Sequence, residues 1–249
     1  MKAMILAAGL GTRLQRLTAD RPKALVEING RTLLEIALSR LRAFGIHEVI
    51  INVHHFADMM LEYLRVNRNF DMHIEVSREE VLLDTGGGLK RAGYFFLQDS
   101  SRLEQPFILH NVDVLSTIDL GRMLQFHTGH QALATLAVQE RQTSRSLLFD
   151  QQQQLCGRRS GSDQTADVVR PSEGRPQALA FCGIHVISPR IFAMMSEQGV
   201  FPIVSCYMRL AAQGEKILAF RADECYWRDL GKPENLVQAA QDLREKALL

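Results

Sequence analysis

The sequence predicts an α/β protein in which helices cover both faces of a mixed, mostly parallel sheet, a three-layer Rossmann-like arrangement. Two observations lead to this prediction. Short apolar segments alternate with helical patterns through residues 2–110, and strands that alternate with helices assemble into mainly parallel sheets. The strand segments are also apolar along their whole length, which is typical of strands that are buried on both faces.

The alternation starts at residues 2–7, a short apolar segment with the length of a buried strand. Residues 33–44 carry apolar side chains at the three- and four-residue spacing of a helix face. The same two patterns recur along the first half of the chain. They predict strands at residues 49–53, 73–76 and 107–110, and helices at residues 57–66 and 89–97.

The second half of the chain is richer in strand patterns, which occur at residues 132–138, 146–149, 178–187 and 216–220. Residues 157–177 are polar and contain Gly, Ser, Pro and Arg, so we expect a loop or lid there. The glutamines at 151–154 are expected to form a hairpin turn. A final helix is predicted at residues 233–247. The sequence contains no internal repeat, and we expect residues 1–249 to form a single domain.

The composition is ordinary for a globular protein, with 46% hydrophobic and 23% charged residues. The formal net charge of +1 provides no overall field for nucleic acid or an anionic membrane, so neither is expected as a partner. No stretch approaches the roughly 18 apolar residues of a membrane span. The four cysteines form no Cys-x-x-Cys pair, which argues against a zinc site and a disulfide framework. We therefore expect a cytoplasmic protein with reduced thiols.

The segment from Leu6 to Leu14 follows the first predicted strand and has the sequence Leu-Ala-Ala-Gly-Leu-Gly-Thr-Arg-Leu. Small residues and two glycines at a strand end let backbone N–H groups approach an anion closely. A dinucleotide fingerprint would need a third glycine where Leu14 stands, and a Walker A loop would need Gly-Lys-Ser or Gly-Lys-Thr, which the chain lacks. The segment is therefore interpreted as a phosphate-binding loop of another kind.

Cationic side chains accompany this loop. The guanidinium group of Arg13 is a planar, permanently charged fork that suits phosphate oxygens. Lys23 adds a compact charge, and Pro22 restricts the backbone immediately before it. These residues favour a phosphate site over a glycine turn with solvated charges.

The loop, followed by Pro22-Lys-Ala-Leu25, resembles the signature of the sugar-1-phosphate nucleotidyltransferases. The resemblance continues in the family's order through Asp84-Thr-Gly-Gly-Gly88, Asn111-Val-Asp113, Phe181-Cys-Gly-Ile184 and Trp227-Arg-Asp-Leu-Gly231. It covers almost the whole chain and is greatest to the short N-acetylmuramate-1-phosphate uridylyltransferases, then to mannose- or heptose-1-phosphate guanylyltransferases. It implies the nucleotide-diphospho-sugar transferase fold, with a nucleotide-binding half at about residues 1–115 and a sugar-phosphate-binding half at about 116–249.

The resemblance also implies a catalytic site. Mg²⁺ is expected as cofactor, with Asp113 and Asp229 as its ligands. A carboxylate just past a strand of a parallel sheet also suits Mg²⁺, although Val112 stands where the family usually has glycine. Arg13 is expected to hold the leaving phosphates, and Lys23 to contact the acceptor or α-phosphate, as the two catalytic residues.

Nucleotide binding is implied for two groups of residues. They are the loop residues Leu6, Ala7, Ala8, Gly9, Gly11 and Thr12, and a second group of Gly86, Gly87, Gly88 and Asn111. On the acceptor side, the backbone at Gly183 is expected to approach the sugar. The family often has a further lysine for the sugar phosphate, and Arg170 is the nearest candidate for that role here.

We therefore expect Mg²⁺-dependent transfer of a nucleotidyl group from an NTP, with UTP or GTP favoured, to a sugar 1-phosphate, giving an NDP-sugar and pyrophosphate. The acceptor phosphate is already anionic, so catalysis would consist mainly of alignment and charge neutralisation. Two alternatives stay open: transfer to a non-sugar phosphate, such as CTP to phosphocholine, and a catalytically silent regulatory subunit that binds nucleotide sugars. The sequence leaves the base, the sugar and any homo-oligomer undetermined.

Overall fold

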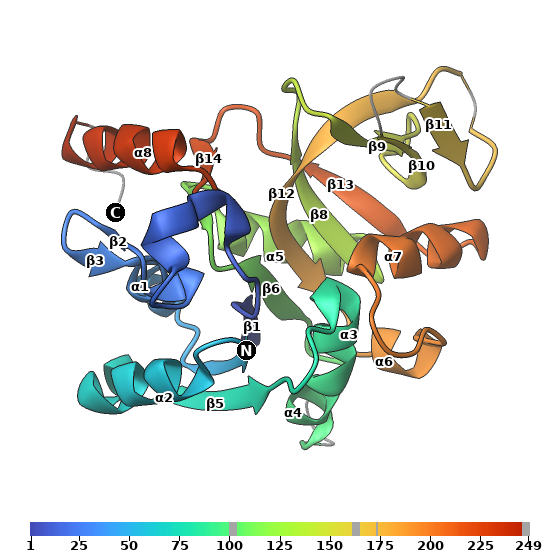
Figure 1. Cartoon of the computed structure of the whole chain (residues 1–249). Coiled ribbons are helices and arrows are strands. Elements are labelled where there is room, and N and C mark those ends of the chain that lie inside the picture. Colours follow the sequence, from blue (N-terminus) through green and yellow to red (C-terminus); the bar gives the residue numbers. More distant parts are fainter. Residues whose placement is uncertain (100–103, 161–164, 173, 246–249) are drawn as a thin grey trace.

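Four parallel strands form the part of the sheet that contains the N-terminus (Figure 1). The computed structural model describes residues 1–99, 104–160, 165–172 and 174–245. β1 (Lys2–Leu6) pairs with β4 (Glu48–Val53) and with β6 (Phe107–Asn111), and β5 (His73–Arg78) pairs with β4. Because Leu6 lies opposite Asn111 at the ends of their strands, the segments that follow β1 and β6 start from the same edge.

The long strand β12 (Gln177–Ile187) runs against its neighbours. It pairs antiparallel with β6 and with β8 (Ala134–Gln139), and β8 pairs in parallel with β13 (Ile217–Arg221). In the described part of this central sheet, β12 is the only strand of opposite direction. The predicted mixed, mostly parallel sheet is therefore confirmed.

An antiparallel extension continues from the N-terminal part of β12. It consists of β9 (Arg145–Phe149), β10 (Leu155–Ser160) and β11 (Thr165–Val168), in that order outward from β12. In Figure 1 this extension lies at the upper right, above α7. β11 forms the exposed edge of the sheet.

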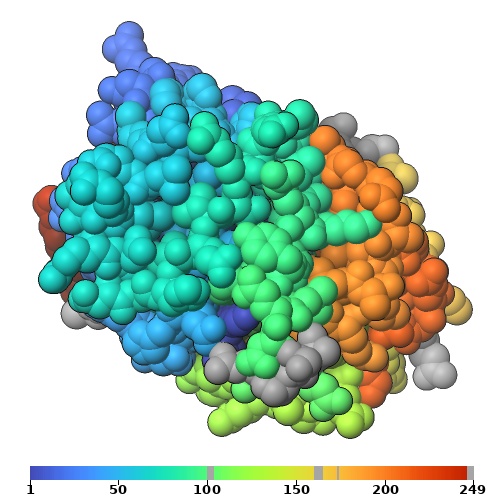
Figure 2. Space-filling view, turned by 90° about the horizontal axis from the view of Figure 1, so that it is seen from below, coloured from blue at the N-terminus to red at the C-terminus, as the bar shows by residue number. Residues whose placement is uncertain are grey.

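Alternating side chains of the strands divide the apolar core into two layers. In β1, Ala3 and Ile5 belong to one buried cluster, whereas Met4 belongs to the other. Four helices cover the first cluster: α1 (Leu33–Ala43), α2 (Ala57–Val66), α5 (Leu120–Gly129) and α8 (Pro233–Glu245). Four others cover the second: α3 (Asp84–Arg91), α4 (Gly93–Leu97), α6 (Ile191–Met194) and α7 (Ile203–Ala212). Figure 2 shows the green α4 region beside the orange α6 region on this second face. The predicted three layers are thus confirmed.

Short elements connect these layers. Three are 3₁₀ helices, namely η1 (Thr12–Thr18), η2 (Lys23–Leu25) and η3 (Arg68–Asp71). Four short strands form two antiparallel pairs, β2 (Glu27–Ile28) with β3 (Arg31–Thr32), and β7 (Val114–Ser116) with β14 (Trp227–Asp229). The second pair brings a C-terminal segment beside the residues that follow β6. Across the described residues, none of the helices has both the length and the apolar character needed to cross a bilayer.

The helical region predicted at residues 89–97 is confirmed: it consists of the end of α3, which already begins at Asp84, and of α4, with a break at Ala92. One prediction about elements was wrong. The loop predicted at residues 157–177 contains the end of β10 and all of β11, which pair with each other antiparallel. Because β11 is exposed along its length, it has no apolar alternation that would reveal a strand. Residues 161–164 and 173 of that predicted loop lie outside the described residues.

Candidate active site

The loop after β1 turns sharply at Gly11, which has a φ of +66°. A Cβ atom at this position would lie 2.9 Å from Thr18 Cγ2 and 3.0 Å from Lys23 Cβ. The Gly11 carbonyl accepts the N–H of Leu14 at 2.8 Å and the Thr18 hydroxyl at 3.0 Å. Glycine is therefore required both for the left-handed backbone and for the close approach of η1 to Lys23.

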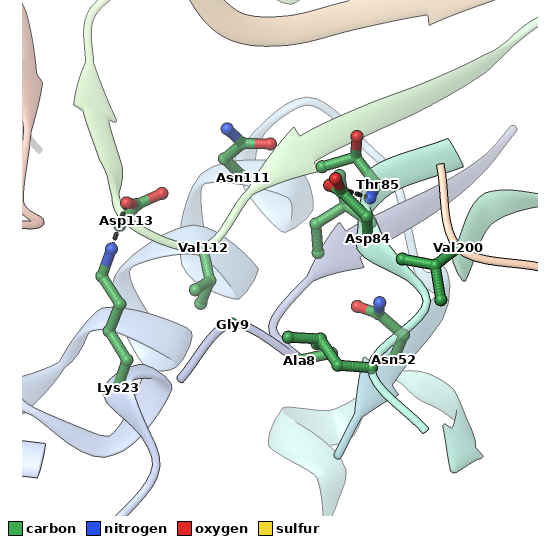
Figure 3. A pocket seen from close by; sticks show the side chains of 12 residues that line it. Ala8, Gly9, Lys23, Asn52, Asp84, Thr85, Asn111, Val112, Asp113 and Val200 are labelled. Carbon is green, nitrogen blue, oxygen red and sulfur yellow. Dashed lines mark hydrogen bonds and ion pairs between the residues drawn. The ribbon is translucent and has the colours of Figure 1, made fainter. Parts of the chain in front are cut away.

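Lys23 and Asp113 form an ion pair between η2 and the segment after β6 (Figure 3). The Lys23 ammonium donates to Oδ2 of Asp113, and their side chains are only 11% and 19% exposed. Pro22 is extended, with φ −67° and ψ 148°, and η2 starts directly after it. The Pro-Lys sequence thus places the ammonium group next to the carboxylate that follows β6.

The second carboxylate, Asp229, is brought beside Asp113 by the β7–β14 pair. Asp229 lies opposite Val114 in this pair, and the Leu230 N–H donates to the Asp113 carbonyl at 2.8 Å. Arg13 approaches from η1, with 3.5 Å between its Nη2 and Oδ2 of Asp229. The four residues expected to carry the chemistry therefore lie together, as two cation–carboxylate pairs.

The donor set at this point has the chemistry of a Mg²⁺ site. Asp113 and Asp229 supply hard carboxylate oxygens, and the side-chain amide of Asn111 lines a cavity together with both of them. Among the described residues there is no cluster of three or more His, Cys, Asp or Glu side chains. Such a set does not suit zinc, whereas Mg²⁺ is commonly held by one or two carboxylates together with substrate phosphates.

Val112 retains the turn that leads to Asp113. Its φ is negative, so the position does not require glycine. Its N–H donates to the Leu6 carbonyl at 3.1 Å, which continues the β1–β6 ladder, and its side chain is buried in the core. With Val112 in place of the family's usual glycine, the Asp113 side chain still lines the cavity.

A first cavity of ≈ 330 Å³ extends from the loop after β1 toward α3. Its loop end is lined by Leu6, Ala8, Gly9 and Lys23, and its far end by Leu82, Asp84, Thr85 and Val200. Figure 3 shows Asn111 and Asp113 above it, with Asp84 and Thr85 on the opposite side from Lys23. Of the predicted nucleotide-binding residues, Leu6, Ala8, Gly9 and Asn111 line this cavity.

Ala7 and the far end of this cavity are connected by a buried hydrogen-bond network. The Ala7 N–H donates to Oδ1 of Asn52 at 2.8 Å, and Nδ2 of Asn52 donates to Glu79 at 2.7 Å. The other oxygen of Glu79 accepts the N–H of Leu83 at 2.9 Å. This network fixes the loop after β1 relative to the segment before α3. Asn52 and Glu79 were not predicted as site residues, because each is an isolated polar residue near the end of a strand.

The three glycines of α3 pack against protein atoms. A Cβ at Gly86 would lie 2.3 Å from the Phe201 ring, and one at Gly87 would lie 2.4 Å from the carbonyl oxygen of Gly199. One at Gly88 would lie 2.7 Å from Glu79. The N–H groups of Gly86 and Gly87 both donate to the Phe201 carbonyl. The glycines thus allow close packing of α3, and the side chains of Asp84 and Thr85 are the ones that reach the cavity.

A second cavity of ≈ 750 Å³ shares Asn111 and Asp113 with the first. Its floor is the irregular part of β12, where the register with β8 shifts between Phe181 and His185. Gly183 lies in this irregularity with a φ of +72°, and a Cβ there would lie 2.8 Å from Nδ2 of Asn111. The structure therefore brings the backbone of Gly183 to the point where the cavities meet.

Arg170 is not brought to either cavity. Its guanidinium group pairs with the buried carboxylate of Asp150 at 2.8 Å and donates to Gln154 at 2.8 Å. Its expected role toward the sugar phosphate has no geometric support. Four arginines that the sequence analysis did not single out line the second cavity instead: Arg141, Arg145, Arg158 and Arg159. The signal that could have identified them was the close spacing of two pairs of arginines, Arg141 with Arg145 before a predicted strand and Arg158 with Arg159 in the predicted loop.

The glycine-containing loop after β1, the neighbouring carboxylates of Asp113 and Asp229, and two cavities that meet at Asp113 form an arrangement suited to phosphoryl or nucleotidyl chemistry. The nucleotidyl transferase family model matches residues 2–246. The chain is 32% identical to N-acetylmuramate alpha-1-phosphate uridylyltransferase of Caulobacter vibrioides, over 98% of this chain and 97% of the relative. It therefore belongs to the nucleotidyl transferase family and is a nucleotidyltransferase.

Other similarities agree with this family. The chain is 28% identical to mannose-1-phosphate guanylyltransferase of Mycobacterium tuberculosis, over 97% of this chain but only 64% of that protein's length. The crystal structure of HddC from Yersinia pseudotuberculosis complexed with GMP-PN superposes with a TM-score of 0.76 at 21% identity, over 97% of this chain and 99% of HddC. The latter likeness confirms the predicted fold.

Proposed function

We propose that this protein transfers a nucleotidyl group from UTP or GTP to a sugar 1-phosphate, with Mg²⁺, and releases pyrophosphate. The observation that carries the proposal is that two cavities of different volume meet at Asn111 and Asp113. One contains the phosphate loop and Lys23, and the other contains Gly183 and Asp229. A donor and an acceptor bound in these cavities would have their phosphates adjacent at Asp113.

The proposed reaction needs no added base. An anionic oxygen of the acceptor phosphate attacks the α-phosphorus, and the bond from that phosphorus to the bridging oxygen breaks with its electrons leaving on pyrophosphate. Lys23 lies beside Asp113, where its ammonium would neutralise the reacting phosphates. Arg13, which is 56% exposed next to Asp229, is free to turn toward the leaving β- and γ-phosphates.

Asp113 and Asp229 would hold Mg²⁺, which offsets the repulsion between the anionic acceptor and the triphosphate when it is bound. In the structure both carboxylates are paired with cationic side chains. Substrate phosphates that attract Arg13 and Lys23 would therefore release carboxylate oxygens for the metal. The names of the relatives favour UTP or GTP as donor and a hexose-type 1-phosphate as acceptor.

A pyrophosphate-release assay tests the proposal. The four NTPs are crossed with glucose, mannose, N-acetylglucosamine and N-acetylmuramate 1-phosphates, with phosphocholine as a non-sugar acceptor, in the presence and absence of Mg²⁺. Release that needs a sugar 1-phosphate and Mg²⁺ supports the proposal. Release only with phosphocholine would replace it with transfer to a non-sugar phosphate. Tight binding of a nucleotide without any release would instead indicate a regulatory subunit.

A further inference from the structure

Four arginines, which we call the arginine wall, line the second cavity away from the phosphate loop. Arg141 follows β8, Arg145 begins β9, and Arg158 and Arg159 lie on β10. The β9–β12 register pairs Leu147 with Leu179, which directs the start of β9 toward the irregular part of β12. The arginine wall therefore comes from the antiparallel extension, whereas the two carboxylates come from the parallel edge of the sheet.

Among the described residues, the charges that line this cavity do not balance. Its carboxylates, Asp113 and Asp229, already pair with Lys23 and Arg13. Within the wall, Arg158 pairs with Asp167 at 3.1 Å. The other members, Arg141, Arg145 and Arg159, have no carboxylate within 4 Å among the described residues. Arg141 and Arg159 are half-buried, so an anionic ligand in the cavity would supply the counter-charge that the described residues do not.

Arg141 is the most firmly held member of the wall. Its Nη2 donates to the Phe181 carbonyl at 2.9 Å, and its guanidinium carbon lies 3.8 Å from the centre of the Trp227 ring. Trp227 is itself held by a hydrogen bond of 2.7 Å from Nε1 to the Cys182 carbonyl. Burial lowers the pKa of the Arg141 guanidinium, yet Nε has no hydrogen-bond partner in the described structure. The Arg141 guanidinium group is thus held beside the irregular part of β12, which forms the floor of the second cavity, with one of its N–H groups unpaired in the described structure.

One phosphate does not account for all of these cations. In the proposed reaction, the 1-phosphate lies at Asp113, where Lys23 and the metal neutralise it. Arg145 and the β10 arginines lie on other elements that line the same cavity. A cavity of ≈ 750 Å³ is within the range that holds a substituted sugar.

We infer that the arginine wall binds a second anionic group on the acceptor, so that the preferred acceptor is an acidic sugar 1-phosphate. This inference rests on the proposed function and specifies its acceptor. Arginine forks bind carboxylate and phosphate through paired N–H groups, so either group satisfies the chemistry. A neutral sugar 1-phosphate leaves the arginines without a counter-charge and binds more weakly.

Matched acceptor pairs test the inference. N-acetylmuramate and N-acetylglucosamine 1-phosphates differ by a carboxylate-bearing ether, and glucose 1,6-bisphosphate and glucose 1-phosphate differ by a phosphate. With the best NTP, kcat/KM should be at least about 10-fold higher for the acidic member of one pair, the size of a charge-assisted hydrogen bond. The pair that shows the preference tells which acidic group is bound.

Substitution connects this preference to the wall. In Arg145→Gln and Arg159→Gln the ratio of acidic to neutral kcat/KM should fall about 10-fold, whereas Arg122→Gln, on an exposed part of α5, should leave the ratio unchanged. Equal kcat/KM for both members of each pair, or a ratio that neither variant moves, would overturn the inference and leave the proposed function intact. Absence of pyrophosphate release with every acceptor would instead reject the proposed function itself.

Discussion

Asp113→Asn removes one charge at the junction of the two cavities while keeping the shape of the side chain. The backbone carbonyl of residue 113 would still accept the Leu230 N–H, so β14 should stay paired with β7. The main loss to the fold is the counter-ion of Lys23, which is 11% exposed. Leaving a partly buried charge unpaired costs about 1–3 kcal/mol, which for this chain length is a fall in Tm of roughly 2–12 °C.

The effect on catalysis should be much larger. Loss of one group that stabilises transition-state charge lowers kcat by about 10²–10³-fold, equivalent to about 3–4 kcal/mol, and a weakened Mg²⁺ site adds to it. Pyrophosphate release at several Mg²⁺ concentrations measures kcat and the metal requirement together. The matched control is Asp58→Asn, which removes an exposed carboxylate that pairs with Arg78 at 2.9 Å.

Folded Asp113→Asn protein with kcat within about threefold of the original would refute the role of Asp113. Thermal unfolding of the same samples shows whether the variant is folded. Should Asp113→Asn fail to fold, Asp229→Asn serves as the second variant, because Asp229 is 35% exposed and is less embedded in the protein. Normal turnover by that variant would equally reject the two-carboxylate metal site.

The remaining predictions concern the acceptor phosphate, the sugar, the core and pH. Lys23→Ala should lower kcat/KM by about 10²-fold or more with little change in nucleotide affinity, checked by kinetics and calorimetry. Gly183→Ala places a Cβ 2.8 Å from Nδ2 of Asn111, so KM for the sugar phosphate should rise more than KM for the NTP in steady-state assays. Gly86→Ala should lower Tm, because its Cβ would lie 2.3 Å from the Phe201 ring. Burial lowers the pKa of His185 to about 3, below its unfolded value of about 6.5. The stability from this histidine is present above pH 6.5 and declines as pH falls toward 3, so urea midpoints should drop between pH 7 and 5, and less steeply in His185→Gln.

Local patterns were sufficient for the residues that follow the parallel strands. The apolar run before Leu6 predicts β1, and the glycines and Arg13 after it predict an anion loop, because both depend on neighbours in the chain. A parallel sheet also implies that the ends of β1 and β6 share one edge. Asp113 could therefore be predicted near the phosphate loop before any coordinates were known.

Acceptor residues could not be predicted in the same way. Arg170 was the nearest candidate in the sequence for the family's phosphate-binding lysine, but in the fold it pairs with buried Asp150. Arg159 reaches the cavity because β10 pairs with β9, and the part of β10 that contains Arg159, residues 157–160, is polar and has no apolar period. The glycines of α3 are a second case. Their sequence predicts a loop that contacts the nucleotide, whereas the closeness of Gly86 to the Phe201 ring shows that glycine is also needed there for packing.

The sequence by itself determined the strands and helices of the parallel part of the sheet, the glycine-containing loop after β1 and the two carboxylates expected to hold the metal, because each follows from residues close together in the chain or from motifs in the family's order. Only the tertiary structure decided which cations face those carboxylates and which arginines surround the acceptor. The physical reason is that long-range strand pairing sets these distances: the β7–β14 register places Asp229 opposite Val114, and the β9–β10 register carries Arg158 and Arg159 to the cavity.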